Sequence, residues 1–154
     1  MPKTMNAYRA LCMQVKCQAV SMIKEKAEAR AVMRKSIERL HTQIKAAVAF
    51  IGEDTKFIVL PEYFLTGFPM GDSIAAWADK AALEMNGAEY ESLGKIAQDA
   101  KVFLAGNAYE TDPKFPGLYF QTCFLIEPSG NVVLRYRRLN SMFAPTPHDV
   151  WDKY

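Results

Sequence analysis

Residues 58–64, Ile-Val-Leu-Pro-Glu-Tyr-Phe, constrain the fold most, because a run of β-forming side chains ends at a proline and a carboxylate. Residues 56–60 predict a short strand covered on both faces, and Pro61 cannot continue the hydrogen bonding of a central strand. We therefore expect Glu62 at the carboxyl end of a buried strand. In layered α/β folds this edge often carries ligand sites, and a glutamate there can act as a general base. The alternative is a solvated glutamate in a surface loop.

Length and composition indicate one globular domain. The chain has 154 residues, half of them hydrophobic and 23% charged, which suffices for a domain-sized core. A net charge of +2 with dispersed Lys and Arg argues against a nucleic-acid partner or an anionic membrane surface. The apolar run at residues 46–52 is far shorter than the ~20 residues that cross a bilayer, and Lys16 interrupts the early run that resembles a signal peptide. These features predict a soluble, cytoplasmic protein without a membrane partner.

The three cysteines predict neither a disulfide framework nor a metal site. Cys12, Cys17 and Cys123 leave one thiol unpaired in any pairing scheme. Their spacing relative to His41 and His148 is not that of a zinc site. We expect reduced thiols that are mostly buried as small core side chains.

Strand and helix patterns alternate along the chain. Residues 8–20 alternate apolar and polar side chains, which predicts a first strand. Residues 24–51 place apolar side chains at the spacing of one helical face, which predicts a long amphipathic helix. Residues 86–100 predict a second helix, and the apolar run at residues 101–109 predicts the next strand.

A hairpin is expected next. Residues 119–126 and 131–137 are rich in β-forming side chains, and they flank a Glu-Pro-Ser-Gly turn at residues 127–130. Earlier in the chain, the turn-rich loop at residues 66–71 follows the Glu62 strand, where it could line a pocket. The order of elements predicts a mixed sheet with helices packed on it, in the α/β or layered sandwich class. A nucleotide-binding fold is disfavoured, because no glycine-rich phosphate loop follows a strand.

Two motifs resemble the nitrilase, or carbon–nitrogen hydrolase, superfamily. The first is Leu-Pro-Glu-Tyr-Phe at residues 60–64 with Thr66-Gly67, and the second is Pro-Ser-Gly-Asn-Val-Val-Leu-Arg-Tyr-Arg-Arg at residues 128–138. Both occur in the family's order, and the resemblance runs from the first strand to the hairpin. It implies that residues 1–154 are the N-terminal portion of one carbon–nitrogen hydrolase domain, with the C-terminal portion absent.

The resemblance implies a fold and a reaction. The fold would be part of an αββα sandwich, with a mixed sheet and helices packed on one of its faces. The reaction would be hydrolysis of a small nitrile, amide or carbamoyl compound by glutamate, lysine and cysteine, without metal or organic cofactor. Glu62 falls on the position of the glutamate base, and we expect Tyr63 and Phe68 to contact the substrate. In such chemistry the base deprotonates a thiol, the thiolate attacks the carbon, and a cation stabilises the developing charge.

The chain departs from the family pattern at two places. Arg138 stands where the family has its lysine; an arginine keeps the positive charge but cannot give up a proton. The alternative for Arg138 is a solvated charge at the end of a strand, beside Arg135 and Arg137. The second departure is the nucleophile, because the family's cysteine lies beyond the lysine motif and the sequence ends before it.

Two hypotheses follow from these departures. In the first, the chain supplies Glu62 and Arg138 to a hydrolase whose cysteine is encoded further on. In the second, it is a non-catalytic homologue or an interaction subunit. A half sandwich would expose one sheet face and a sheet edge, so we expect association with another chain, as in a homo-oligomer.

Overall fold

One mixed β-sheet organises the protein, whose computed structural model describes residues 6–154. The strands follow the order β1-β2-β4-β5-β6, and β3 pairs with β4 as well. Pairs β1/β2, β2/β4 and β3/β4 are parallel, whereas β4/β5 and β5/β6 are antiparallel. The six strands are β1 (Arg9–Cys12), β2 (Thr55–Val59), β3 (Leu83–Glu84), β4 (Phe103–Thr111), β5 (Phe120–Ile126) and β6 (Val132–Arg137).

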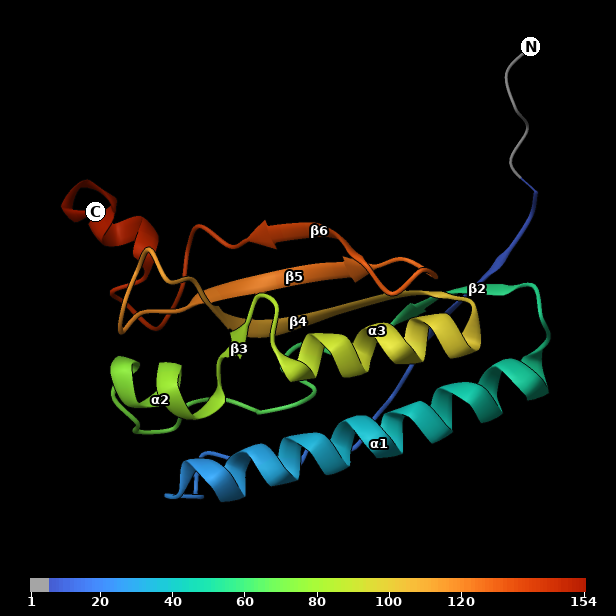
Figure 1. Cartoon of the computed structure of the whole chain (residues 1–154), viewed down its shortest axis with the longest axis horizontal. Coiled ribbons are helices and arrows are strands. Elements are labelled where there is room, and N and C mark those ends of the chain that lie inside the picture. Colours follow the sequence, from blue (N-terminus) through green and yellow to red (C-terminus); the bar gives the residue numbers. More distant parts are fainter. Residues whose placement is uncertain (1–5) are drawn as a thin grey trace, which may run out of the picture.

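The helices lie on one side of this sheet (Figure 1), which confirms the expected mixed α/β class. Helix α1 (Lys26–Ile51) buries a face that includes Met33, Leu40 and Ile44, as its apolar spacing predicts. Helix α3 (Ala88–Ala100), which lies within the helix predicted at residues 86–100, likewise turns Tyr90, Leu93, Ile96 and Ala97 inward.

Helix α2 (Ile74–Ala81), which lies between α1 and α3 in the sequence, has no counterpart among the predicted elements. It has only eight residues and directly follows the turn-rich loop, so its periodicity is too short to stand out. The Ser73 hydroxyl accepts a hydrogen bond from the Ala76 N–H and caps the helix. The Trp77 side chain is fully buried and anchors α2 to the core.

The predicted first strand was wrong in its length, because β1 ends at Cys12 rather than at residue 20. Its partner β2 ends at Val59, just before Pro61, so the following residues have no strand to pair with. The segment that follows stays extended, and the Val20 N–H bonds to the Thr66 carbonyl at 2.9 Å. Alternation of apolar and polar side chains therefore indicates an extended, half-buried backbone. It does not predict that the whole segment pairs with a neighbouring strand.

The hairpin and the preceding strand lie where the sequence predicts them. The Gly130 N–H bonds to the Glu127 carbonyl at 2.8 Å, which closes the turn between β5 and β6. A β-bulge between Leu125 and Ile126 shifts the register of these two strands by one residue. The strand expected at residues 101–109 begins two residues later, because Lys101 caps α3 in the left-handed conformation.

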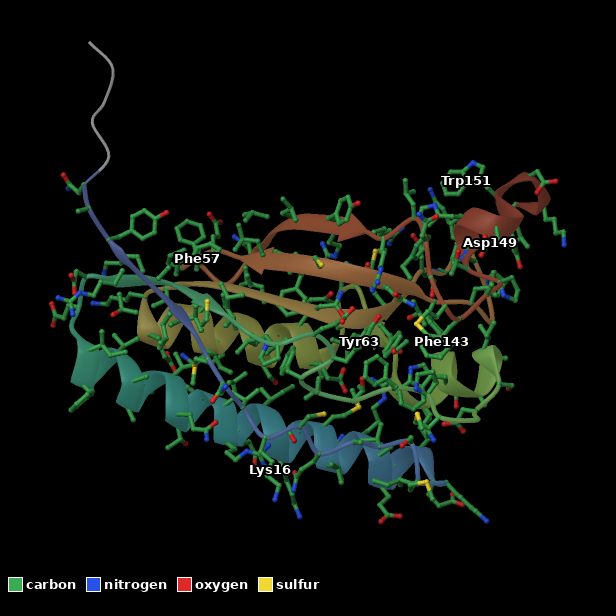
Figure 2. The ribbon with its side chains drawn as sticks, turned by 180° about the vertical axis from the view of Figure 1, so that it is seen from behind. Lys16, Phe57, Tyr63, Phe143, Asp149 and Trp151 are labelled. Carbon is green, nitrogen blue, oxygen red and sulfur yellow. The ribbon has the colours of Figure 1, made fainter. Side chains whose placement is uncertain are left out.

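The sheet face opposite the helices has no covering layer among residues 6–154. Its side chains are largely apolar, and Leu134 and Tyr136 are 49% and 58% exposed. Cys12 and Cys123 are exposed there, and Cys17 is exposed in the segment after β1. The expectation of mostly buried thiols was therefore wrong, because it presumed side chains packed over the strands on both faces. Figure 2 shows Phe57 at one end of the sheet and Trp151, in the 3-10 helix η1 (Pro147–Lys153), at the other end.

Candidate active site

Glu62 lies in a tight turn directly after β2. Pro61 ends the strand, as predicted, and Tyr63 adopts a left-handed backbone conformation with φ of 49°. Its carbonyl oxygen accepts hydrogen bonds from the N–H groups of Thr66 and Gly67 at 3.2 and 3.0 Å. The strained conformation is held by these bonds, and it places consecutive side chains on opposite sides of the turn. Glu62 faces solvent, while the Tyr63 side chain is buried.

Arg138 directly follows the last residue of β6, and its side chain extends to Glu62. Its Nη1 donates to Oε1 of Glu62 at 2.8 Å, across 76 residues of sequence. The two side chains are 47% and 50% exposed, so the pair lies at an open edge of the sheet. The contact brings together the two residues predicted to be catalytic. Burial lowers the pKa of Arg138, but attraction to Tyr63 and Glu62 outweighs it, and the net pKa is raised.

The other two arginines of the motif have a different role. Arg135 and Arg137 both donate to the fully buried carboxylate of Glu110, at 3.0 and 3.2 Å. Arg137 also bonds to Asp112 at 2.9 Å. These side chains project toward the helix side of the sheet, where Arg135 lies over the ring of Tyr90. Arg138 thus lies apart from Arg135 and Arg137, and it contacts Glu62 instead of Glu110.

Tyr63 packs within a cluster of aromatic rings behind the Glu62–Arg138 pair. Its ring stacks on Tyr109, with centroids 4.3 Å apart and an angle of 3° between the planes. Burial, reinforced by the nearby Glu62 carboxylate, raises the pKa of Tyr63 to about 12. Phe68 packs edge-on against Tyr63 at 5.1 Å and is 49% exposed. Figure 2 shows Tyr63 in the interior, between the strands and the helices. Substrate contact by Tyr63 and Phe68 stays a prediction.

A shallow groove of about 440 Å³ runs from Glu62 along the uncovered sheet face. Its floor is mostly apolar and comes from β2, β4, β5 and β6. Asn107 lies in it and is 8% exposed, and its Nδ2 donates to the Cys123 sulfur at 3.5 Å. The Asn107 Oδ1 atom is buried without a partner among residues 6–154. This groove contains Glu62 but neither Tyr63 nor Phe68.

Gln121, on β5, is a polar neighbour of the pair that the sequence interpretation missed. Its side-chain oxygen accepts from Arg138 Nη1 at 3.2 Å, and its carbonyl oxygen accepts from the Arg138 N–H at 2.9 Å. Gln121 is 3% exposed. Pairing of the predicted hairpin brings the start of one strand near the end of the other, but it does not single out Gln121, because the bulge at Leu125 shifts the register by one residue.

Within residues 6–154, no group of three or more His, Cys, Asp and Glu side chains is placed to hold a metal ion. No helix in that part of the chain is both long and apolar enough to span a membrane.

His148 packs against the rings of Phe120 and Trp151, and Asp149 accepts hydrogen bonds from Thr146. Both residues belong to the first turn of η1.

Comparison with known proteins identifies the family. Residues 17–154 match the family described as carbon-nitrogen hydrolase. A formamidase from Helicobacter acinonychis (strain Sheeba) is 28% identical over 97 residues, which cover 62% of this chain and 27% of that protein.

Solved structures share the fold at low sequence identity. The Nit3 protein of Saccharomyces cerevisiae, a member of branch 10 of the nitrilase superfamily, matches with a TM-score of 0.59 and 22% identity, over 75% of this chain and 43% of its own. A carbon-nitrogen hydrolase from Helicobacter pylori G27 matches with a TM-score of 0.57 and 18% identity, over 88% of this chain and 41% of its own. The chain thus spans less than half the length of these relatives. With the family match extending over most of its length, the chain belongs to the carbon–nitrogen hydrolase family.

Proposed function

We propose that this chain supplies the base and the cation of a thiol-dependent carbon–nitrogen hydrolase that acts on a small amide, nitrile or carbamoyl compound. The observation that supports the proposal is the 2.8 Å contact between Glu62 and Arg138 at the carboxyl end of β2. A carboxylate and a guanidinium at a strand end are suited to proton transfer and to charge stabilisation, respectively. The nucleophilic cysteine would come from polypeptide outside these 154 residues.

Each residue has a defined role in the proposed reaction. With an amide or carbamoyl substrate, Glu62 removes the proton from the thiol, and the thiolate attacks the substrate carbon to form a tetrahedral intermediate. With a nitrile the attack gives a thioimidate, and water must add to it before the nitrogen can leave. Arg138 stabilises the negative charge that develops on the substrate heteroatom. Glu62 then returns the proton to the leaving nitrogen, and water resolves the thioester with Glu62 acting as a base again. The reaction needs no metal or organic cofactor.

An arginine on the lysine position restricts what the cation can do. The guanidinium stays charged throughout the physiological pH range, so it stabilises charge but does not donate a proton. All proton transfers in the proposed cycle therefore fall to Glu62. Tyr63 and Phe68 would border the substrate on the loop side, where Phe68 is half exposed.

Formamide is the first substrate to test, because the formamidase relative is 28% identical to part of this chain. The full natural polypeptide that contains this chain should be assayed for ammonia release from formamide, other short amides and small nitriles. Glu62→Gln should lower turnover at least about 100-fold, as expected for loss of a general base. The matched control is Glu53→Gln, at an exposed position in the turn before β2, which should leave turnover unchanged.

Two results would contradict the proposal. Unchanged turnover in Glu62→Gln would remove the base assignment, provided that the circular dichroism spectra of both variants match the wild type. Absence of turnover in the wild type with every one of these substrates would favour the non-catalytic homologue instead.

We also infer that the protein is a cytoplasmic homo-oligomer. Three free cysteines are typical of a reducing compartment, and the apolar sheet face that residues 6–154 leave uncovered favours association with further polypeptide, either the rest of the domain or another copy. Light scattering of the purified full polypeptide should give a mass that is a multiple of the monomer mass. A monomer at micromolar concentration would contradict the inference.

A further inference from the structure

We propose that Gln121 is a positioning residue that holds the Arg138 guanidinium against Glu62. The inference rests on the proposed function, because it assigns Gln121 a role in the same reaction. It adds a group from β5 to a site that is otherwise formed by the ends of β2 and β6.

Gln121 holds Arg138 at both its backbone and its side chain. The Arg138 N–H donates to the Gln121 carbonyl oxygen at 2.9 Å, which continues the β5/β6 pairing one residue beyond β6. From the side chain, Nη1 of Arg138 donates to the Gln121 Oε1 at 3.2 Å and to Glu62 Oε1 at 2.8 Å. A single nitrogen thus meets two acceptors, and these fix the plane of the guanidinium.

The orientation of the Gln121 amide is itself fixed. Its Nε2 donates to the hydroxyl oxygen of Ser141, and that oxygen also accepts from the Phe143 N–H at 3.0 Å. Turning the amide over would place its two N–H donors against the Arg138 donors. The buried amide therefore has one favourable orientation, in which the oxygen faces Arg138.

Glu62 by itself is a weak anchor for Arg138. Both members of that ion pair are about half exposed, and exposed ion pairs are weakened by solvent and by the mobility of long side chains. Gln121 is 3% exposed and is packed in the sheet, so its position is much better defined. A charge-stabilising group must stay close to its working geometry, since small displacements reduce the rate strongly.

The test is Gln121→Met in the full natural polypeptide. This substitution keeps the length of the side chain and removes the two hydrogen bonds of the side-chain amide, to Arg138 and to Ser141, but leaves the backbone bond to Arg138 in place. We expect kcat for formamide to fall roughly ten- to 100-fold with KM little changed, because the guanidinium acts mainly in the transition state. Gln121→Glu keeps an acceptor for Arg138 and should restore most of kcat. The matched control is Gln98→Met, which removes a hydrogen bond to the Ser129 carbonyl in the hairpin turn and should keep full activity.

Crystal structures of the wild type and Gln121→Met separate failure of this inference from failure of the proposed function. Loss of the Arg138–Glu62 contact in the variant supports positioning by Gln121, even if the wild type hydrolyses none of the substrates. A retained contact, or unchanged kcat in an active enzyme, overturns it. If Gln121→Met does not fold, Ser141→Ala removes the acceptor of the amide instead. It should lower kcat several-fold, and an unchanged kcat there overturns the inference as well.

Discussion

Arg135 donates from Nε to Oε2 of Glu110 over 3.0 Å, and the carboxylate that it meets is completely buried. The same carboxylate accepts from the Tyr90 hydroxyl at 2.8 Å and from Arg137 at 3.2 Å. These bonds join α3, β4 and β6 on the helix side of the sheet. Two of the three arginines in residues 135–138 therefore bond to Glu110 within the fold, and the third, Arg138, bonds to Glu62 in the candidate site.

Removing the Glu110 charge should destabilise the protein strongly. Glu110→Gln leaves two arginines beside a neutral amide, and breaking a buried pair of this kind typically costs about 3 kcal/mol. Urea unfolding at pH 7 measures the change. The control is Asp79→Asn, which breaks an exposed pair with Lys26 and should change the free energy of unfolding by less than about 1 kcal/mol. Equal effects of the two variants would contradict a structural role for Glu110.

Arg138 should contribute to the rate through its charge. Arg138→Met is expected to lower kcat about 100- to 1,000-fold in the full polypeptide, as for loss of a group that stabilises an oxyanion. Arg138→Lys keeps the charge but cannot reproduce the guanidinium geometry, so it should lose roughly tenfold. Steady-state kinetics with formamide compare these variants with Arg34→Met, an exposed position on α1 that should behave as wild type. A fully active Arg138→Met would show that the cation is dispensable.

Gly94 on α3 is expected to tolerate no larger side chain. A Cβ atom there would lie 2.6 Å from the backbone oxygen of Gly130, where α3 packs against the hairpin turn. Alanine favours a helix by up to about 1 kcal/mol over glycine, but the clash with backbone should exceed this gain. Gly94→Ala should therefore lower the melting temperature. Ser92→Ala, at an exposed position of the same helix, should leave it unchanged or raise it, and the opposite order would contradict the packing.

Asp112 should contribute to stability at neutral pH and not in acid. The Lys114 N–H, assisted by Arg137, lowers the pKa of this carboxyl. A lowered pKa in the folded state means that the contribution is present above the unfolded value of about 3.9 and is lost as the pH falls through the folded value. Asp112→Asn should thus be less stable than wild type at pH 7, and the difference should shrink toward pH 3. Urea unfolding at both pH values measures it; a difference independent of pH would contradict the prediction.

The main elements were predictable because each has a strong local pattern. The faces of α1 and α3 repeat over several turns, and the turn at residues 127–130 carries its own signal. The extent of β1 was not predictable, because it depends on where its partner β2 ends. The exposure of Cys12 and Cys123 likewise depends on what packs over the sheet, which no local pattern reports.

The site was predictable only in part. Glu62 and Arg138 each follow a strand, and the motifs name both as candidates; the structure places them in contact. Counting back from the hairpin turn would place Phe120 opposite Arg138, but the bulge at Leu125 shifts the pairing so that Gln121 takes that place. A shift of one residue exchanges the two faces of a strand. The polar partner of Arg138 therefore emerges only from the three-dimensional register.

The position of β6 has a consequence for how the site can fail. Among the described strands β6 pairs with β5 alone, so Arg138 is attached to the core through an edge strand. Opening of that strand would detach the guanidinium from Glu62 while the helices and the parallel strands stay folded. The fraction of molecules with a complete site is then set by a local opening equilibrium, which amide hydrogen exchange can measure, and not by the stability of the whole domain.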